Sequence, residues 1–352
     1  MGGNNMSRHA VTIVLVVCIV LLSVFASTVH AEEKGKKYKI KIATLAPEGS
    51  SWMKRFHESS RAIENRSQGR LKIKIYAGGI MGDEADIIRK IRIGQLDGAA
   101  VTGVGLGIIQ PAVRVLDLPF LFKSNDELDF IRERLSKEFE EKFKERGYVL
   151  LGWGEVGWIH VFSNSPVTNK QQLLATKLWA WVDDPLAHRM FDQIGVKGIP
   201  LALPAVLPHL QTGLIDAAYG SPLSTIALQW YTTVKYMSDL PITMANAAVM
   251  ISKKTFDELP SDLQEIFLEE GKHMQKSLID QVRSDNEESL RVLKKFGIQV
   301  TKTEEAFADE MEVAAHEVWE QLASTLYPPE LLARIQELLS EFRADHGKPS
   351  TQ

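Results

Sequence analysis

The chain has 352 residues, of which 45% are hydrophobic, and a formal net charge of -4 with the two signs interspersed along it. At ~150 residues per domain this length indicates about two domains, with enough apolar side chains to form a core without disulfides. The absence of a basic tract excludes nucleic acid as an expected partner.

Residues 1–31 have the pattern of a secretory signal peptide. Arg8 is the only lysine or arginine before Lys34, residues 11–25 are nearly all apolar, and small residues follow them before a charged stretch. The apolar run is shorter than the ~20 residues that a membrane span needs, which favours a cleaved peptide over an anchor. We therefore expect a mature protein in the periplasm, secreted through the inner membrane.

The only cysteine, Cys18, lies within this apolar run, so a mature chain would contain none. Disulfides, thiol catalysis and zinc–thiolate sites are thereby excluded. The nine histidines include no close ligand pair, and no catalytic motif is found. We predict a binding protein without cofactor or metal, not an enzyme.

The mature chain begins with alternating strand and helix signals. Residues 38–44 and 71–76 alternate apolar and polar side chains, which predicts two strands. Helices are predicted from near Trp52 and over 83–93, and a short buried strand over 99–102. This order is typical of a wound, mostly parallel sheet.

Two glycine-rich segments have spacings close to those of nucleotide-binding loops. Gly152–Gly157 matches G-x-G-x-x-G, but the residues after it predict a strand where a helix is needed, so we interpret it as a connection between strands. Gly103–Gly107 lacks the Lys-Ser/Thr of a phosphate loop and is followed closely by Pro111. We expect a hinge there, or a turn that lines a cleft.

The last third of the chain is predicted to be helical, with breaks near Gly297 and at Pro328 and Pro329. No linker is apparent, so we expect the chain to cross several times between two lobes. The C-terminal helix is amphipathic, and we expect it to brace the body of the protein instead of forming a dimer seam. We assign residues 37–155 and about 245–285 to lobe 1, residues 156–244 and about 286–330 to lobe 2, and residues 331–352 to the C-terminal helix and tail.

Five of the seven tryptophans fall at or next to predicted strand ends or turns. In wound α/β folds, ligands bind beyond the carboxyl ends of the strands, so aromatic side chains there are candidates for a binding site. The alternative is ordinary packing in the core or at its rim. The five are Trp52, Trp153, Trp158, Trp179 and Trp181.

Five stretches in a fixed order span nearly all of the mature chain: Gly78–Glu84 leading to Ile93–Asp97, Val115–Phe122, Leu174–Leu178, Leu210–Ala217 and Ile251–Pro260. Together they resemble the solute receptors of TRAP transporters (tripartite ATP-independent periplasmic transporters). The resemblance implies a two-lobed α/β fold of the periplasmic-binding-protein type, with a wound, mostly parallel sheet in each lobe and a long helix bracing both. It also implies a cleft that closes on a small-molecule ligand, and delivery to the membrane subunits of the transporter.

The sequence departs from the family where a ligand carboxylate would be held. Trp179 stands where the family usually has an arginine that clamps the carboxylate, and Ile159 where a second arginine is frequent. Tyr219 and Gly220 stand where Glu and Asn are frequent. A carboxylate would lose its charge-assisted bonds in such a cleft, whereas aromatic walls favour a hydrophobic, aromatic or cationic ligand.

We therefore expect an uncharged hydrophobic ligand first and a cationic ligand second, with Glu155, Asp183 or Asp184 as the counter-charge. If another arginine such as Arg189 entered the cleft, the protein would be a conventional organic-acid receptor. The same fold could also serve as the ligand-sensing partner of a membrane signalling protein. A branch of TRAP receptors that similarly lacks the arginine works with a tetratricopeptide-type periplasmic protein, which adds such a partner as an expectation. The candidate ligand-binding residues are Trp52, Trp153, Glu155, Trp158, Trp179, Trp181, Asp183, Tyr219 and Ser221.

Overall fold

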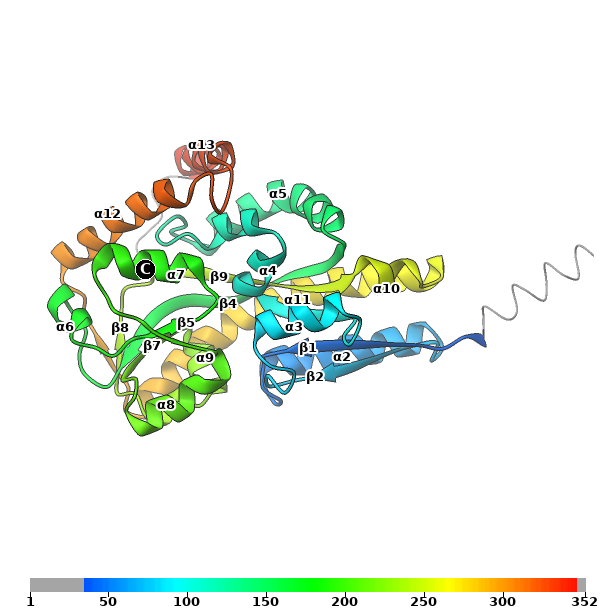
Figure 1. Ribbon diagram of the computed structural model, residues 1–352, viewed down its shortest axis with the longest axis horizontal. Coiled ribbons are helices and arrows are strands. Elements are labelled where there is room, and N and C mark those ends of the chain that lie inside the picture. The colour runs from blue at the N-terminus through cyan, green and yellow to red at the C-terminus, as the bar shows by residue number, and fades with distance from the viewer. Residues whose placement is uncertain (1–34, 347–352) are drawn as a thin grey trace, which may run out of the picture.

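The computed structural model describes residues 35–346, and the predicted signal peptide lies outside them. Figure 1 shows two α/β lobes side by side, with the N-terminal strands in one and the short strands of the middle of the chain in the other. Within residues 35–346, no helix is long and apolar enough to span a bilayer.

Lobe 1 is a sheet with helices on both faces. Its strands β1 (Tyr38–Thr44), β2 (Leu71–Tyr76) and β3 (Gly98–Thr102) are parallel, with β1 in the middle. Ile40 and Ile42 of β1 face one layer of helices and Ala43 faces the other, so the strand is buried on both sides. The helices are α2 (Ser51–Arg66), α3 (Glu84–Arg92), α4 (Gly103–Ile109), α5 (Asn125–Glu145) and α10 (Lys253–Asp257).

Lobe 2 is built from shorter elements. Strands β7 (Ala217–Gly220) and β8 (Tyr236–Ser238) pair antiparallel with the end of one long strand, and β10 (Gln299–Thr301) is parallel to β8. Strands β5 (Trp179–Trp181) and β6 (Ile199–Leu201) form a separate parallel pair. The helices are α6 (Lys170–Leu174), α7 (Pro185–Ile194), α8 (Val206–Thr212), α9 (Pro222–Ala227) and α12 (Glu305–Leu322).

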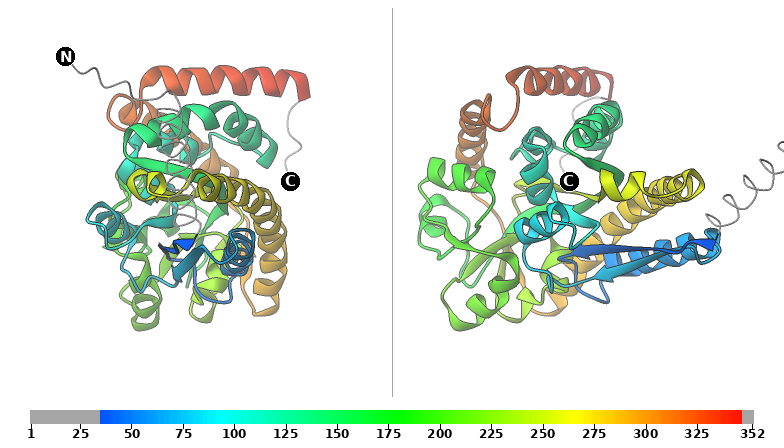
Figure 2. Two further views of the ribbon diagram at one scale, coloured as in Figure 1. Left: turned by 90° about the vertical axis from the view of Figure 1, so that its right-hand side faces the viewer. Right: turned by 45° about the vertical axis from the view of Figure 1, so that its right-hand side comes forward.

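Two long strands and one long helix connect the lobes. Strands β4 (Tyr148–Ser163) and β9 (Thr243–Ser252) pair antiparallel, and only the last residues of β4, His160–Ser163, pair with β7 of lobe 2. Helix α11 (Ser261–Lys295) packs against α2 in lobe 1 and against α9 in lobe 2. Figure 2 shows α11 curving along both lobes. The predicted two-lobed α/β fold with a long bracing helix is confirmed, while the limits of each lobe in residue numbers stay a prediction.

Gly152–Gly157 belongs to β4 and does not connect two separate strands, so that prediction was wrong. The glycines are needed because other groups approach the strand closely. A Cβ atom on Gly152 would lie 2.7 Å from the carbonyl oxygen of Gly271 in α11, and one on Gly154 would lie 2.6 Å from the ring of Trp52. Gly157 has a φ of +117°, next to a shift in the register between β4 and β9.

Gly103–Gly107 forms most of helix α4 and is neither a hinge nor a turn, which corrects the second glycine-based prediction. Here the glycines make room for buried charged side chains. A Cβ atom on Gly103 would lie 2.8 Å from Nη1 of Arg114, and one on Gly107 would lie 2.8 Å from the aliphatic stem of the same arginine. The position of α4 beside the ligand cleft agrees with the expectation that the segment lines it.

The C-terminal helix α13 (Pro329–His346) packs on α5. Phe342 contacts Phe130 with ring centroids 4.8 Å apart, and Arg343 pairs with Glu127 at 2.8 Å. Its apolar face is therefore used against the body of the protein, in agreement with the interpretation of this helix as a brace.

Candidate ligand-binding cleft

A cavity of about 170 Å³ lies where the two lobes meet. Lobe 1 contributes α4 and the 3-10 turn Pro111–Asp117, β4 and β9 form the floor, and β5, α7, β7 and α9 close it from lobe 2. A second cavity of about 110 Å³ extends toward Trp52. The two cavities form one cleft, because they share the lining residues Thr102, Val156, Leu203, Ser224 and Leu228.

One wall of the cavity is aromatic. Trp179 stacks on Tyr219 with ring centroids 4.7 Å apart and meets Trp230 edge to face at 5.7 Å. Nε1 of Trp179 donates a hydrogen bond to the carbonyl of Leu201, and the Tyr219 hydroxyl accepts one from the backbone N–H of Trp181. Since these polar atoms are paired within lobe 2, the ring faces are left for apolar contact.

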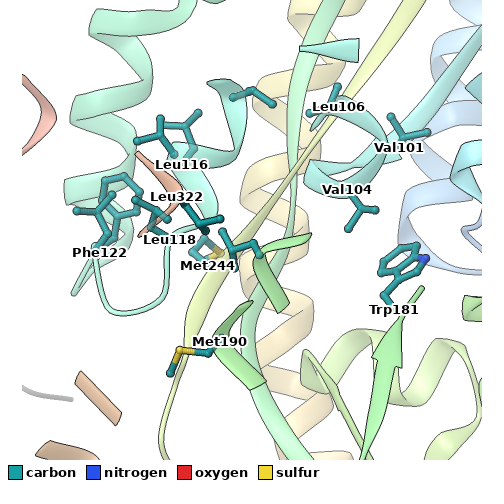
Figure 3. Close-up of a cluster of buried hydrophobic side chains, with 14 of the residues drawn as sticks. Val101, Val104, Leu106, Leu116, Leu118, Phe122, Trp181, Met190, Met244 and Leu322 are labelled. Atoms are coloured by element: carbon teal, nitrogen blue, oxygen red, sulfur yellow. The ribbon is translucent and has the colours of Figure 1, made fainter. Parts of the chain in front are cut away.

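Trp181 also joins the two lobes. Its Nε1 donates to Oδ2 of Asp83 at 2.9 Å, and the backbone N–H of Leu203 donates to the same oxygen at 3.1 Å. Asp83 is the N-cap of α3 in lobe 1, and burial raises the pKa of its carboxyl group. Figure 3 shows Trp181 pointing from its strand toward Val104 of α4, which lines the same cavity.

Arg114 is the only cation among the described residues that line the cleft, and the sequence analysis missed it. It is 4% exposed; its Nη2 donates to Oδ1 of Asp184 at 2.8 Å, and its Nη1 lies 3.2 Å from Oδ2 of Asp117. Burial opposes its charge, but the carboxylates of Asp184 and Asp117 hold its pKa above the ordinary value. An arginine within the apolar run 112–116, three residues before an aspartate, is a signal of a buried ion pair that the sequence contains.

Four of the predicted ligand-binding residues reach the cleft. Trp179, Trp181 and Tyr219 line the first cavity, and Trp52 lines the second. Nε1 of Trp52 donates to the backbone carbonyl of Glu155 at 3.0 Å, which fixes the ring against β4. Their role in binding a ligand stays a prediction, but the structure brings all four together at the lobe interface.

Three other predicted residues lie away from the lining of the cleft. Trp153 is buried against Phe139 with ring centroids 6.1 Å apart, and Trp158 donates to Oδ1 of Asn125. Ser221 is buried as the N-cap of α9, where its hydroxyl accepts from the backbone of Ser224. Ordinary packing and helix capping account for these side chains.

The acidic residues predicted as counter-charges for a cationic ligand are either paired with arginines or lie outside the lining of the cleft. Glu155 is fully buried and bonds to Arg132 and Arg283 at 2.5 and 2.6 Å. Asp183 is exposed on the surface next to the cleft-lining Asp184. Arg189 is exposed on α7 and does not line the cleft, so Arg114 is the arginine that reaches it.

The lining is suited to noncovalent binding of a small molecule. Apart from a few polar and acidic side chains and Arg114, the residues that line the first cavity are aliphatic and aromatic. Over residues 35–346, no group of three or more His, Cys, Asp or Glu side chains is arranged to hold a metal ion. The cleft can enclose a ligand in an apolar space and contact it from both lobes.

The sequence profile of the bacterial extracellular solute-binding proteins, family 7, matches residues 42–325. A solute-binding protein of Chromohalobacter salexigens is 27% identical over 241 residues, which cover 68% of this chain and 70% of that protein. The 2,3-diketo-L-gulonate-binding periplasmic protein of Escherichia coli is 23% identical over 244 residues, covering 68% of this chain and 73% of that protein.

Solved structures share the fold at low sequence identity. The sugar acid binding protein of Advenella mimigardefordensis in complex with galactonate has a TM-score of 0.82 at 19% identity, covering 87% of this chain and 99% of its own. A TRAP periplasmic solute binding protein of Desulfovibrio salexigens with bound orotic acid has a TM-score of 0.80 at 20% identity, with the same two coverages, 87% and 99%. With a family profile that matches most of its length, the chain belongs to the bacterial extracellular solute-binding proteins of family 7, the solute receptors of TRAP transporters.

Proposed function

We propose that the protein captures an uncharged hydrophobic or aromatic small molecule outside the cytoplasm and delivers it to the membrane subunits of a TRAP-type transporter. Membership of its family makes it a transport receptor and not an enzyme. The observation that supports the ligand class is the lining of the cleft, whose aromatic and aliphatic side chains surround a single arginine already paired with Asp117 and Asp184.

The volume of the cleft limits the size of the ligand. An engineered protein cavity of about 150 Å³ lined by Leu, Ile and Phe stays dry and binds benzene. The first cavity, of about 170 Å³, therefore suits one aromatic ring or a branched hydrocarbon of similar size. The second, of about 110 Å³, has room for a short extension toward Trp52.

Energetics favour an apolar ligand over an anion in this setting. Moving a group the size of a phenyl ring from water into an apolar cavity is favourable by about 2–3 kcal/mol. A carboxylate entering the cleft would have to leave water and either compete with Asp184 and Asp117 for Arg114 or stay unpaired. The apolar contribution is available without breaking any existing ion pair.

A conventional organic-acid receptor is the second candidate, because Arg114 lines the cleft and structures of the same fold hold galactonate and orotic acid. A ligand-sensing partner of a signalling protein would use the same cleft with a different membrane partner. The tetratricopeptide-type periplasmic partner also stays a prediction.

The test is to identify what the protein carries. The protein is purified natively from its periplasmic fraction, denatured, and the released small molecules are analysed by mass spectrometry, with the same protein stripped of ligand by unfolding and refolding as the control. We expect an uncharged compound with one ring or a short branched chain. A small carboxylate in stoichiometric amount would contradict the proposal and establish the organic-acid alternative.

A further inference from the structure

The charge of Arg114 is neutralised from both lobes. Asp117 lies in the same 3-10 turn of lobe 1, and Asp184 is the N-cap of α7 in lobe 2. Oδ1 of Asp184 accepts from Nη2 of Arg114 at 2.8 Å and from the backbone N–H groups of Leu186 and Ala187 at 3.1 and 3.4 Å. Three donors thus fix this carboxylate at the edge of the cavity.

The carboxylate of Asp117 is held as firmly as that of Asp184. Its Oδ1 accepts from the backbone N–H and the side-chain amide of Asn246 at 2.9 and 3.1 Å. Oδ2 lies beside Gly103, where a Cβ atom would collide with the carboxylate, and contacts Nη1 of Arg114 at 3.2 Å. Since Gly103 and Asn246 set the position of Asp117, it does not move aside without disturbing α4 and β9.

The cluster therefore has two carboxylates for one guanidinium. A ligand carboxylate would be a third negative group around Arg114, at a site where the guanidinium is 4% exposed and Asp117 is 5% exposed. Like charges at short distance in a buried site disfavour each other. The arrangement resists an anion even though an arginine lines the cavity.

We infer that Asp184 excludes carboxylates from the cleft by acting as a built-in counter-ion of Arg114. This inference rests on the proposed function and names the residue that sets the charge preference of the site. Asp184 and Arg114 come from opposite lobes, so their ion pair forms where the lobes meet and takes the place that a ligand carboxylate would need beside the guanidinium.

Four ligands with one ring each test the inference on the wild-type protein: benzamide, benzoate, benzylamine and toluene. Affinities are measured by isothermal titration calorimetry with protein freed of any bound compound. We expect benzamide and toluene each to bind at least ~10-fold more tightly than benzoate, a difference of about 1.4 kcal/mol. Because this comparison needs no substitution, it stays decisive if a variant fails to fold.

The role of Asp184 is tested with Asp184→Asn, in which the side chain keeps its shape and its capacity to cap α7. Loss of the negative charge leaves Arg114 with one carboxylate, so the affinity for benzoate should rise at least ~10-fold while that for benzamide changes little. The matched control is Asp192→Asn, an exposed aspartate of the same helix, which should leave both affinities unchanged.

Each possible result of these binding experiments contradicts a specific part of the inference. Tightest binding of benzoate by the wild type overturns both this inference and the proposed class of ligand. Unchanged benzoate affinity in Asp184→Asn overturns the role of that residue and leaves the apolar receptor intact. Benzylamine binding most tightly overturns the uncharged class of ligand, and binding of none of the four overturns the assigned ligand class.

Discussion

Glu84 lies in the first turn of α3 and is 1% exposed, although it carries a carboxyl group. Its oxygens accept hydrogen bonds from the N–H and hydroxyl of Thr102 and from the N–H of Gly105. Burial disfavours the charged form more than these bonds favour it, so the pKa of Glu84 is raised from 4.5 to about 7. The group also lines the second cavity, as Trp52 does.

This pKa shift predicts how stability depends on pH. Between pH 4.5 and about pH 7 the folded protein holds a proton on Glu84 that the unfolded chain has lost, so stability falls as pH rises through this window and is level above it. The Glu84→Gln variant lacks this titration. Urea denaturation gives the free energy of unfolding of the variant minus that of the wild type. This difference should become about 3 kcal/mol more favourable to the variant as the pH rises from 4.5 to 7.5.

The exposed Glu133→Gln on α5 is the control and should follow the wild-type profile. Parallel profiles for Glu84→Gln and the wild type would contradict the raised pKa of Glu84 in the folded protein.

Part of the candidate site was predictable residue by residue. Trp179 and Trp181 stand out as tryptophans at a predicted strand, Tyr219 through its place in the family pattern, and the structure places all three in the lining of one cavity. The pairing of Arg114 with Asp184 was not predictable, because 70 positions separate the two residues and only the meeting of the lobes brings them together. Trp153 and Trp158 show the limit of the aromatic signal, since core packing uses the same side chains.

At the scale of elements, an ion network built around the buried carboxylate of Glu155 fastens α5, β4 and α11 to one another. Arg283 of α11 pairs with Glu155 of β4 and Asp129 of α5 at 2.6 and 2.7 Å, and Arg132 of α5 pairs with the same glutamate. Burial opposes the charge of Arg283, but the carboxylates of Asp129 and Glu155 raise its pKa above the ordinary value. The network lies at the residue before the second register shift of β4, where the strand passes toward lobe 2.

Removing Arg283 takes two charge-assisted hydrogen bonds from the fully buried Glu155, which keeps only Arg132 as a cationic partner. We expect Arg283→Ala to lower the free energy of unfolding by about 2 kcal/mol, measured by urea denaturation at pH 7. Arg291→Ala is the matched control, since Arg291 lies on the same helix and pairs with Glu288 in an exposed position. It should stay within about 0.5 kcal/mol of the wild type, and equal losses in the two variants would contradict the special role of the buried network.

The elements themselves were predictable where the pattern was local. The alternation of apolar and polar residues identified β1 and β2, and the glycine and proline breaks delimited α11, α12 and α13. The continuity of β4 was missed, because Gly152 and Gly154 have the sequence appearance of a turn. Their actual reason is the close approach of α11 and of Trp52, which depends on tertiary packing that a local pattern does not contain.

For the whole molecule, three contacts hold the lobes together around the cleft. Arg114 pairs with Asp184, Asp83 accepts from Trp181 and Leu203, and Gly79 approaches Pro204 so closely that a Cβ atom would lie 3.1 Å from the proline ring. All three connect lobe 1 to lobe 2, and the pair of Arg114 with Asp184 lies in the lining of the first cavity. They identify the described conformation as a closed one.

The contribution of Asp83 to closure is open to a distance measurement. Ile80 and Val182 lie on opposite lobes and are 71% and 46% exposed, and the only native cysteine is in the predicted signal peptide. Spin labels on cysteines at these two positions report the interlobe distance by double electron–electron resonance. In Asp83→Asn one of the two carboxylate oxygens is replaced by an amide group that does not accept hydrogen bonds. The remaining oxygen cannot serve both the N-terminus of α3 and the two donors of lobe 2, Trp181 and Leu203. The distribution of interlobe distances should therefore shift to longer values.

The control for this measurement is Asp86→Asn on the same helix, whose partner Arg89 is in lobe 1. Its distance distribution should match that of the labelled parent. If Asp83→Asn matches the parent as well, the hydrogen bonds of Asp83 do not hold the lobes together.

The order in which strands appear along the chain has a consequence for biogenesis. Gly98 of β3 pairs with Ile251 of β9, and β9 also pairs with β4. Helix α11, which covers this sheet, ends only at Lys295. A chain that emerges from its N-terminus cannot complete the first sheet until most of its length is present. The early residues therefore stay without their partners for much of synthesis, and such a late-folding polypeptide would suit a translocation channel that threads extended chains, as the predicted signal peptide requires.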